Sequence, residues 1–109
     1  MSELARTFRG LADRRRRHAI FCLQKHHAIL LADLAEFVAV REEATEVGTP
    51  SDETVRDVYF SLYHTHLPLL EDADLVRYNQ EQDLVTRTNA TGTLLRNAHQ
   101  EVGSLLQVG

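Results

Sequence analysis

The sequence predicts a small α+β domain that consists mainly of helices. Four stretches carry apolar residues at the i, i+3, i+4 spacing of amphipathic helices. One segment, residues 75–88, has two apolar runs on either side of a polar tip, which is the pattern of a β-hairpin. The length of 109 residues suits one domain, and 43% hydrophobic residues can build its core.

The first half of the chain predicts two helices with a short strand between them. The first helix spans roughly residues 11–26, with Asp13 near its start, and residues 27–30 (HAIL) allow a short extended segment. A second helix follows, with apolar side chains on one stripe from Leu31 to Ala39. Gly48 and Pro50 mark the loop after it.

The second half predicts a helix, a hairpin and a final helix. A helix over residues 51–71 would be capped by Ser51 or Asp52 and bent at Pro68, which has no backbone N–H. Strands 75–78 and 84–88 flank a tip at 79–83 that lacks an Asn-Gly turn, so a longer and mobile loop is expected. The last helix covers about residues 91–107.

Helix, strand, helix, helix, hairpin and helix follow one another in the order of a winged helix-turn-helix. Residues 1–90 form the predicted winged-helix domain, and residues 91–109 form a C-terminal helix rather than a separate domain. This helix has a leucine-rich stripe longer than one small domain needs, which favours pairing of two subunits. The predicted dimer contacts are Leu94, Leu95, Ala98, Val102, Leu105 and Leu106, with Phe8 and Leu11 as further candidates.

Two segments resemble known winged-helix proteins. LADRRRRHAIFCLQKH (residues 11–26) is similar to the first helix of archaeal regulators related to arsenic repressors. HLPLLEDADLVRYN (residues 66–79) resembles the end of their recognition helix and the start of their wing. More narrowly, the run of four arginines together with LYHTHLP resembles uncharacterised winged-helix domains of halophilic archaea. The resemblance covers residues 8–90 and implies the fold and a regulatory role.

The chain departs from the arsenic-repressor pattern at two places. Cys22 is its single cysteine, so the paired cysteines that bind metal in that class are missing. Asp74 stands where that class has a glycine before Leu-Val. The resemblance therefore implies no metal-sensing function.

His64 and His66 look like a pair of metal ligands, but a helix separates them. Only Thr65 lies between the two histidines, so on a helix their side chains differ in direction by about 200°. Two metal ligands on one helix need i, i+3 or i, i+4 spacing instead. We expect His66 to be buried beneath the hairpin with a ring nitrogen bonded to the backbone. His64 belongs to the polar face, which is either a solvated surface or a DNA-reading one.

In a winged helix, that polar face would enter the major groove of duplex DNA. The predicted DNA contacts are Thr54, Arg56, Ser61, His64 and Thr65 on the helix, with Arg77 and Arg87 on the hairpin. Asp52, Glu53 and Asp57 on the same helix and the formal net charge of −4 oppose this reading, because carboxylates repel phosphates. A protein-interaction module without DNA affinity is therefore the alternative.

Two further clusters are open to more than one interpretation. Arg14–Arg17 could contact phosphates or could pair with nearby carboxylates on a solvated surface. His18, Cys22 and His26 recur every four residues, which is the spacing of metal ligands. A metal or redox sensor at these residues is therefore the third possibility, although a core role for Cys22 is favoured. The sequence contains no phosphate-binding loop or nucleophile motif. We expect a cytoplasmic, non-catalytic homodimer that binds duplex DNA, with no cofactor, metal, membrane or small-molecule substrate.

Overall fold

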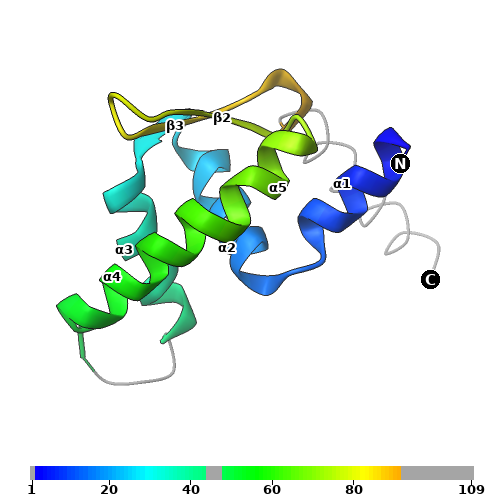
Figure 1. Cartoon of the computed structure of the whole chain (residues 1–109). Coiled ribbons are helices and arrows are strands. Elements are labelled where there is room, and N and C mark those ends of the chain that lie inside the picture. Colours follow the sequence, from blue (N-terminus) through cyan, green and yellow to red (C-terminus); the bar gives the residue numbers. More distant parts are fainter. Residues whose placement is uncertain (1, 44–47, 92–109) are drawn as a thin grey trace.

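A computed structural model describes residues 2–43 and 48–91 and places them in a mainly helical α+β fold with one small antiparallel sheet (Figure 1). This confirms the prediction of a mainly helical α+β class, and the arrangement is compatible with a winged helix. The elements are α1 (Glu3–Leu11), α2 (Arg14–Lys25), β1 (Ala28–Leu30), α3 (Leu31–Glu42), α4 (Asp52–Ser61), η1 (Leu62–His66), α5 (Leu67–Asp72), β2 (Val76–Asn79) and β3 (Leu84–Arg87).

The chain begins with two helices where one was predicted. α1 ends at Leu11, and α2 starts at Arg14 after Asp13, whose side chain accepts hydrogen bonds from the backbone N–H groups of Arg15 and Arg16. Asp13 is thus the N-cap of α2, because it satisfies donors that have no partner within the helix. The prediction that the helix begins at Leu11 is wrong, since Leu11 closes the preceding helix.

The sheet has the strand order β1-β3-β2, with both pairs antiparallel. Ala28 of β1 lies opposite Thr86 of β3, and Val76 of β2 lies opposite Arg87. The hairpin strands lie within one residue of their predicted bounds. The tip is a turn in which Asn79 accepts a hydrogen bond from the backbone N–H of Gln82 and Asp83 adopts a left-handed conformation with φ 54°.

The third predicted helix is one continuous rod built of α4, η1 and α5 (Figure 1). Ser51 caps it as predicted, because its hydroxyl accepts from the backbone N–H of Thr54 at 3.1 Å. The middle segment, η1, is a π-helix in which the N–H of Leu67 bonds to the carbonyl of Leu62, five residues earlier. This wide turn comes immediately before Pro68, which has no N–H to continue the ordinary four-residue ladder.

A Schellman motif ends this rod. The N–H of Asp74 bonds to the carbonyl of Glu71 at 2.9 Å, and the N–H of Leu75 bonds to that of Leu70 at 3.0 Å. The motif requires a left-handed residue at Asp74, which has φ 59°. Glycine adopts that conformation most readily, and glycine is the residue that the resemblance to the arsenic-repressor class implies at this position.

The core lies between the helices and the inner face of the sheet. α3 packs against α2 and α4, and α1 packs against α5. Large, fully buried side chains come from every layer and include Leu23, Leu31, Leu34, Leu62, Leu67, Leu70 and Val85. In the part of the chain that the structure describes, no helix combines the length and apolar character needed to cross a membrane.

Only the first residues of the predicted C-terminal helix belong to the part of the chain that the structure describes. Residues 89–91 are helical, and Thr91 is buried with its hydroxyl bonded to the carbonyl of Leu75. The predicted dimer contacts Leu94, Leu95, Ala98, Val102, Leu105 and Leu106 lie outside the described residues. The dimerisation helix therefore stays a prediction.

Candidate nucleic-acid interface

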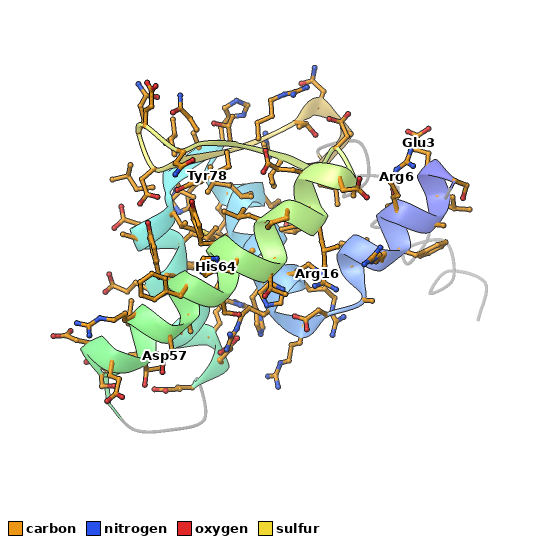
Figure 2. All side chains as sticks on the ribbon, in the orientation of Figure 1. Glu3, Arg6, Arg16, Asp57, His64 and Tyr78 are labelled. Atoms are coloured by element: carbon orange, nitrogen blue, oxygen red, sulfur yellow. The ribbon has the colours of Figure 1, made fainter. Side chains whose placement is uncertain are left out.

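The long helix presents part of the predicted DNA-contact set to solvent. Figure 2 shows His64 and Asp57 on the side of the rod that faces away from the core. Arg56, His64 and Thr65 are exposed there, and Ser61 is partly buried. His66 is only 7% exposed, so the two histidines point to opposite sides of the helix as predicted.

Thr54 has a structural partner at the start of α4. Its hydroxyl accepts a hydrogen bond from the Ser51 hydroxyl at 2.9 Å, and its backbone N–H donates to the same Ser51 oxygen. Its hydroxyl is therefore part of the cap that starts the helix.

The two hairpin arginines differ in their surroundings. Arg77 has a side chain that is 77% exposed, and Asp74 lies 3.7 Å away. Arg87 is partly buried, and its guanidinium donates to the backbone carbonyls of Leu23 and Gln24 at 3.4 and 3.2 Å. Arg87 thus satisfies carbonyls at the end of α2 and ties β3 to that helix, whereas Arg77 stands on the surface.

Carboxylates surround the exposed helix face. Asp52, Glu53 and Asp57 are exposed on α4, and Glu81 is exposed in the hairpin turn. Arg56 is the one cation of α4, and it is exposed beside these carboxylates. The local charge is therefore mixed and leans negative, which weakens the sequence-independent attraction to phosphates.

The four arginines at the start of α2 have separate roles. Arg15 forms a two-pronged ion pair with Glu42, with contacts of 2.6 and 2.8 Å. Arg16 is 8% exposed, and Arg17 donates to the carbonyl of Leu11. Arg14 is exposed. Of the two interpretations, pairing with a carboxylate describes Arg15, whereas Arg16 is buried and only Arg14 and Arg17 are exposed.

The buried histidine has a partner that the sequence did not predict. Nδ1 of His66 lies 3.1 Å from Nη1 of Arg16 and 3.9 Å from Oδ1 of Asp13. The predicted burial is confirmed, but the predicted backbone partner is wrong, because the ring nitrogen meets the guanidinium of α2. Since an arginine can only donate, Nδ1 accepts and carries no proton. Burial lowers the pKa of His66, Asp13 opposes this, and the charge of Arg16 adds to the lowering.

The His18, Cys22 and His26 row does not converge on a shared point. Cys22 is fully buried, and burial raises the pKa of its thiol to about 11. Nδ1 of His18 accepts from Nε of Arg41 at 3.2 Å, whereas His26 is exposed. Among the residues that the structure describes, no three histidine, cysteine or carboxylate side chains are grouped as metal ligands would be.

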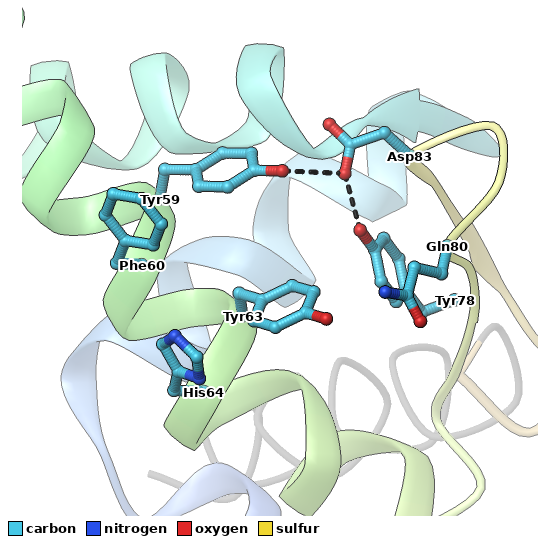
Figure 3. A pocket seen from close by; sticks show the side chains of 7 residues that line it. All are labelled: Tyr59, Phe60, Tyr63, His64, Tyr78, Gln80 and Asp83. Atoms are coloured by element: carbon cyan, nitrogen blue, oxygen red, sulfur yellow. Dashed lines mark hydrogen bonds between the residues drawn. The ribbon is translucent and has the colours of Figure 1, made fainter.

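An aromatic groove between the rod and the hairpin was missed by sequence reasoning (Figure 3). Tyr59, Phe60, Tyr63 and His64 line it from the helix, and Tyr78, Gln80 and Asp83 line it from the hairpin. Its sequence signal is the spacing of Tyr59 and Tyr63, four residues apart and hence on one side of the helix. The facing position of Tyr78 depends on how the hairpin folds back, which no local pattern specifies.

Asp83 holds the two walls of this groove together. Its Oδ1 accepts hydrogen bonds from the hydroxyls of Tyr59 at 3.0 Å and Tyr78 at 2.5 Å (Figure 3). Burial, followed by the hydrogen bond and charge of Asp83, raises the pKa of both tyrosines. Both hydroxyls therefore remain protonated donors at neutral pH.

Comparison with known proteins gives a family without an assigned activity. Neither a curated protein nor a solved structure matches the chain. A family model described as a domain of unknown function, DUF7344, matches residues 8–86, which is most of the chain. This chain belongs to the DUF7344 family.

Proposed function

We propose that this protein is a cytoplasmic, non-catalytic winged-helix regulator that binds duplex DNA. One observation carries the proposal: a long helix with an exposed polar face lies beside a β-hairpin, in a sheet of order β1-β3-β2 (Figure 1). In a winged helix-turn-helix the corresponding helix reads the major groove, and the hairpin, or wing, contacts the neighbouring backbone. α3 and the rod would form the helix-turn-helix.

The exposed side chains divide into two roles in this proposal. His64 and Thr65 can exchange hydrogen bonds with base edges, which carry sequence information. Arg56 on α4 and Arg77 on β2 are exposed cations suited to phosphate oxygens. Thr54 and Arg87 contribute through structure, since their polar groups serve the helix cap and the α2 carbonyls.

We also propose that the protein acts as a homodimer. Leu4 and Phe8 on α1 are 65% and 64% exposed and lie four residues apart, on one side of that helix. Together with the apolar stripe predicted for the C-terminal helix, they would bury apolar surface between two subunits. A two-fold arrangement would set the two reading helices about 34 Å apart, one turn of DNA.

The proposal predicts that the purified protein retains preferred duplex sequences from fragmented genomic DNA. The double substitution His64→Ala, Thr65→Ala should abolish this preference while leaving weaker, sequence-independent binding. Arg14→Ala serves as the control, because Arg14 is exposed on α2 rather than on the rod. A wild-type protein that enriches no sequence, or an equal preference in the double variant, contradicts the assignment of the reading face.

A protein-interaction module is the second candidate function, and the aromatic groove favours it. Half-exposed Phe60 and the flanking carboxylates resemble a protein-binding surface more than a phosphate-binding one. Absence of duplex binding at every salt concentration, with the fold intact, would favour this candidate over DNA binding.

A further inference from the structure

The aromatic groove has the size and composition of a binding site. Its volume is about 580 Å³, within the range of sites that hold a ligand or a partner's side chain. The chain has three tyrosines and no tryptophan, and all three tyrosines line this groove. Phe60 at its edge is 50% exposed, an arrangement that leaves aromatic surface open to solvent.

The rings offer both faces and edges to an occupant. Phe60 and His64 lie nearly parallel, with an interplanar angle of 17° and centroids 6.1 Å apart. Tyr63 stands at 86° to His64 and also at 86° to Tyr78 across the groove. Aromatic faces are negative at their centres, so they attract cations.

The carboxylate of Asp83 adds a full negative charge to this aromatic lining. The hydroxyls of Tyr59 and Tyr78 fix it in place by donating to Oδ1 (Figure 3). A carboxylate has about four acceptor positions, and these two hydroxyls occupy two of them. Asp83 is therefore positioned in advance and can accept further hydrogen bonds.

Most exposed charged side chains on α4 and in the hairpin turn, the two elements that flank the groove, are acidic. Glu81 follows Gln80 in the hairpin turn, and Glu53 and Asp57 are exposed on α4. Asp57 precedes His64 by seven residues, about two helical turns, and both side chains are exposed. Arg56 is the opposing cation on α4, and the carboxylates outnumber it. A cation is therefore the complementary occupant of the groove.

We propose that the aromatic groove binds an arginine side chain carried by a partner protein. A guanidinium is flat, stacks on aromatic rings and donates several hydrogen bonds in its plane, so it can use the rings and Asp83 together. An ammonium group lacks the flat surface for stacking. This inference goes beyond the proposed DNA-binding function, because it assigns a second kind of ligand to a groove that shares only His64 with the proposed reading face.

Tyrosine emission makes the groove directly observable, since every tyrosine of the chain lines it. The probe is the capped tripeptide acetyl-Gly-Arg-Gly-amide, and the matched control peptide has citrulline in place of arginine. Citrulline keeps the shape but has no charge. We expect a saturable change in emission with the arginine peptide and about tenfold weaker binding of the citrulline peptide. Equal binding of the two peptides, or no saturable change, overturns the proposal.

Two variants test whether the carboxylate of Asp83 and the ring of Phe60 bind the arginine peptide. Asp83→Asn removes the charge and tolerates the left-handed conformation, and it should weaken arginine-peptide binding about tenfold. Phe60→Ala removes a half-exposed ring without opening the core and should weaken binding several-fold. Glu3→Gln on α1 is the control and should bind as the wild type does. Urea denaturation of each variant checks the fold, and wild-type affinity in a folded Asp83→Asn or Phe60→Ala protein contradicts the assignment.

A nucleotide probe tests whether the groove binds a nucleotide rather than an arginine side chain. Adenosine monophosphate offers a stacking base and a phosphate, and we expect no change in tyrosine emission with it. Saturable binding of the nucleotide, together with failure of the arginine peptide, contradicts the proposal. The titrations contain no duplex DNA, so their outcome does not depend on whether the rod reads DNA.

Discussion

The guanidinium of Arg16 lies 3.1 Å from Nδ1 of His66, although fifty residues separate them in sequence. The same side chain donates from Nε to the carbonyl of Gly10 at 2.9 Å and from Nη2 to the carbonyl of Arg9 at 3.0 Å. Arg16 therefore links the end of α1, the start of α2 and the π-helical part of the rod. The position of the proposed reading helix depends on this buried group.

Replacing Arg16 by alanine should lower the free energy of unfolding by about 3 kcal/mol, because buried acceptors lose their charged donor. Urea denaturation followed by circular dichroism measures the effect. Arg14→Ala, the exposed neighbour, should change the value by less than about 0.5 kcal/mol. Equal losses in the two variants would show that Arg16 does not hold these elements together.

The stability should fall as the pH drops below the ordinary pKa of histidine. Burial, with the charge of Arg16, holds the pKa of His66 below its ordinary value of 6.5, while Asp13 opposes the shift. The unfolded chain then binds a proton at a pH where the folded chain does not, so stability rises with pH in that interval. The contribution of neutral His66 to the free energy of unfolding is complete above about pH 6.5. It is lost as the pH falls toward the pKa that His66 has in the folded protein.

His66→Gln should therefore reduce the loss of stability between about pH 7.5 and pH 5.5, measured by urea denaturation at each pH. Part of the dependence should remain, because burial and Arg41 also lower the pKa of His18. The double variant with His18→Gln should be the least sensitive to pH. A dependence in His66→Gln as steep as that of the wild type would exclude His66 as a source.

Local signals predicted the elements whose structure is decided locally. Ser51 caps the rod because its side chain needs only the N–H three residues later. β1, α3 and the hairpin follow the apolar periodicity, and their predicted positions are confirmed. The prediction that His64 and His66 point in opposite directions is also confirmed, because one π-helical turn shifts the direction of the side chains only slightly.

Features that depend on distant contacts could not be predicted. The partner of His66 depends on how α2 crosses the rod. No local sequence pattern distinguishes Arg16 from the three arginines beside it. The role of Arg87 depends on the carbonyls of α2, more than sixty residues away. The aromatic groove likewise appears only when Tyr78 and Asp83 are brought opposite Tyr59.

Asp74 should tolerate glycine better than alanine. Its φ of 59° closes the Schellman motif at the end of the rod, a conformation costly for side chains other than those of asparagine and aspartate. We expect Asp74→Gly to raise the free energy of unfolding by up to about 1 kcal/mol and Asp74→Ala to lower it by about 1 kcal/mol. Thermal and urea denaturation measure both, and an alanine variant more stable than the glycine variant would contradict the prediction.

Cys22 should be unreactive in the folded protein. Its side chain is fully buried, and its pKa of about 11 keeps the thiol protonated at pH 8. A disulfide reagent that releases a coloured thiolate should therefore react only as fast as the chain unfolds, and at once in concentrated urea. Reaction in native buffer at the rate of a free thiol would contradict this and would support the redox interpretation instead.

The most direct test of the DNA-binding account is the salt dependence of affinity for a fluorescent duplex, measured by anisotropy. Each phosphate contact contributes about one to the slope of log affinity against log salt. The account predicts measurable binding by the wild type, weaker binding by the double variant Arg56→Ala, Arg77→Ala, and a slope smaller by about two in that variant. Arg14→Ala should keep the wild-type slope. No binding by the wild type at any salt concentration, or an unchanged slope in the double variant, would contradict the account.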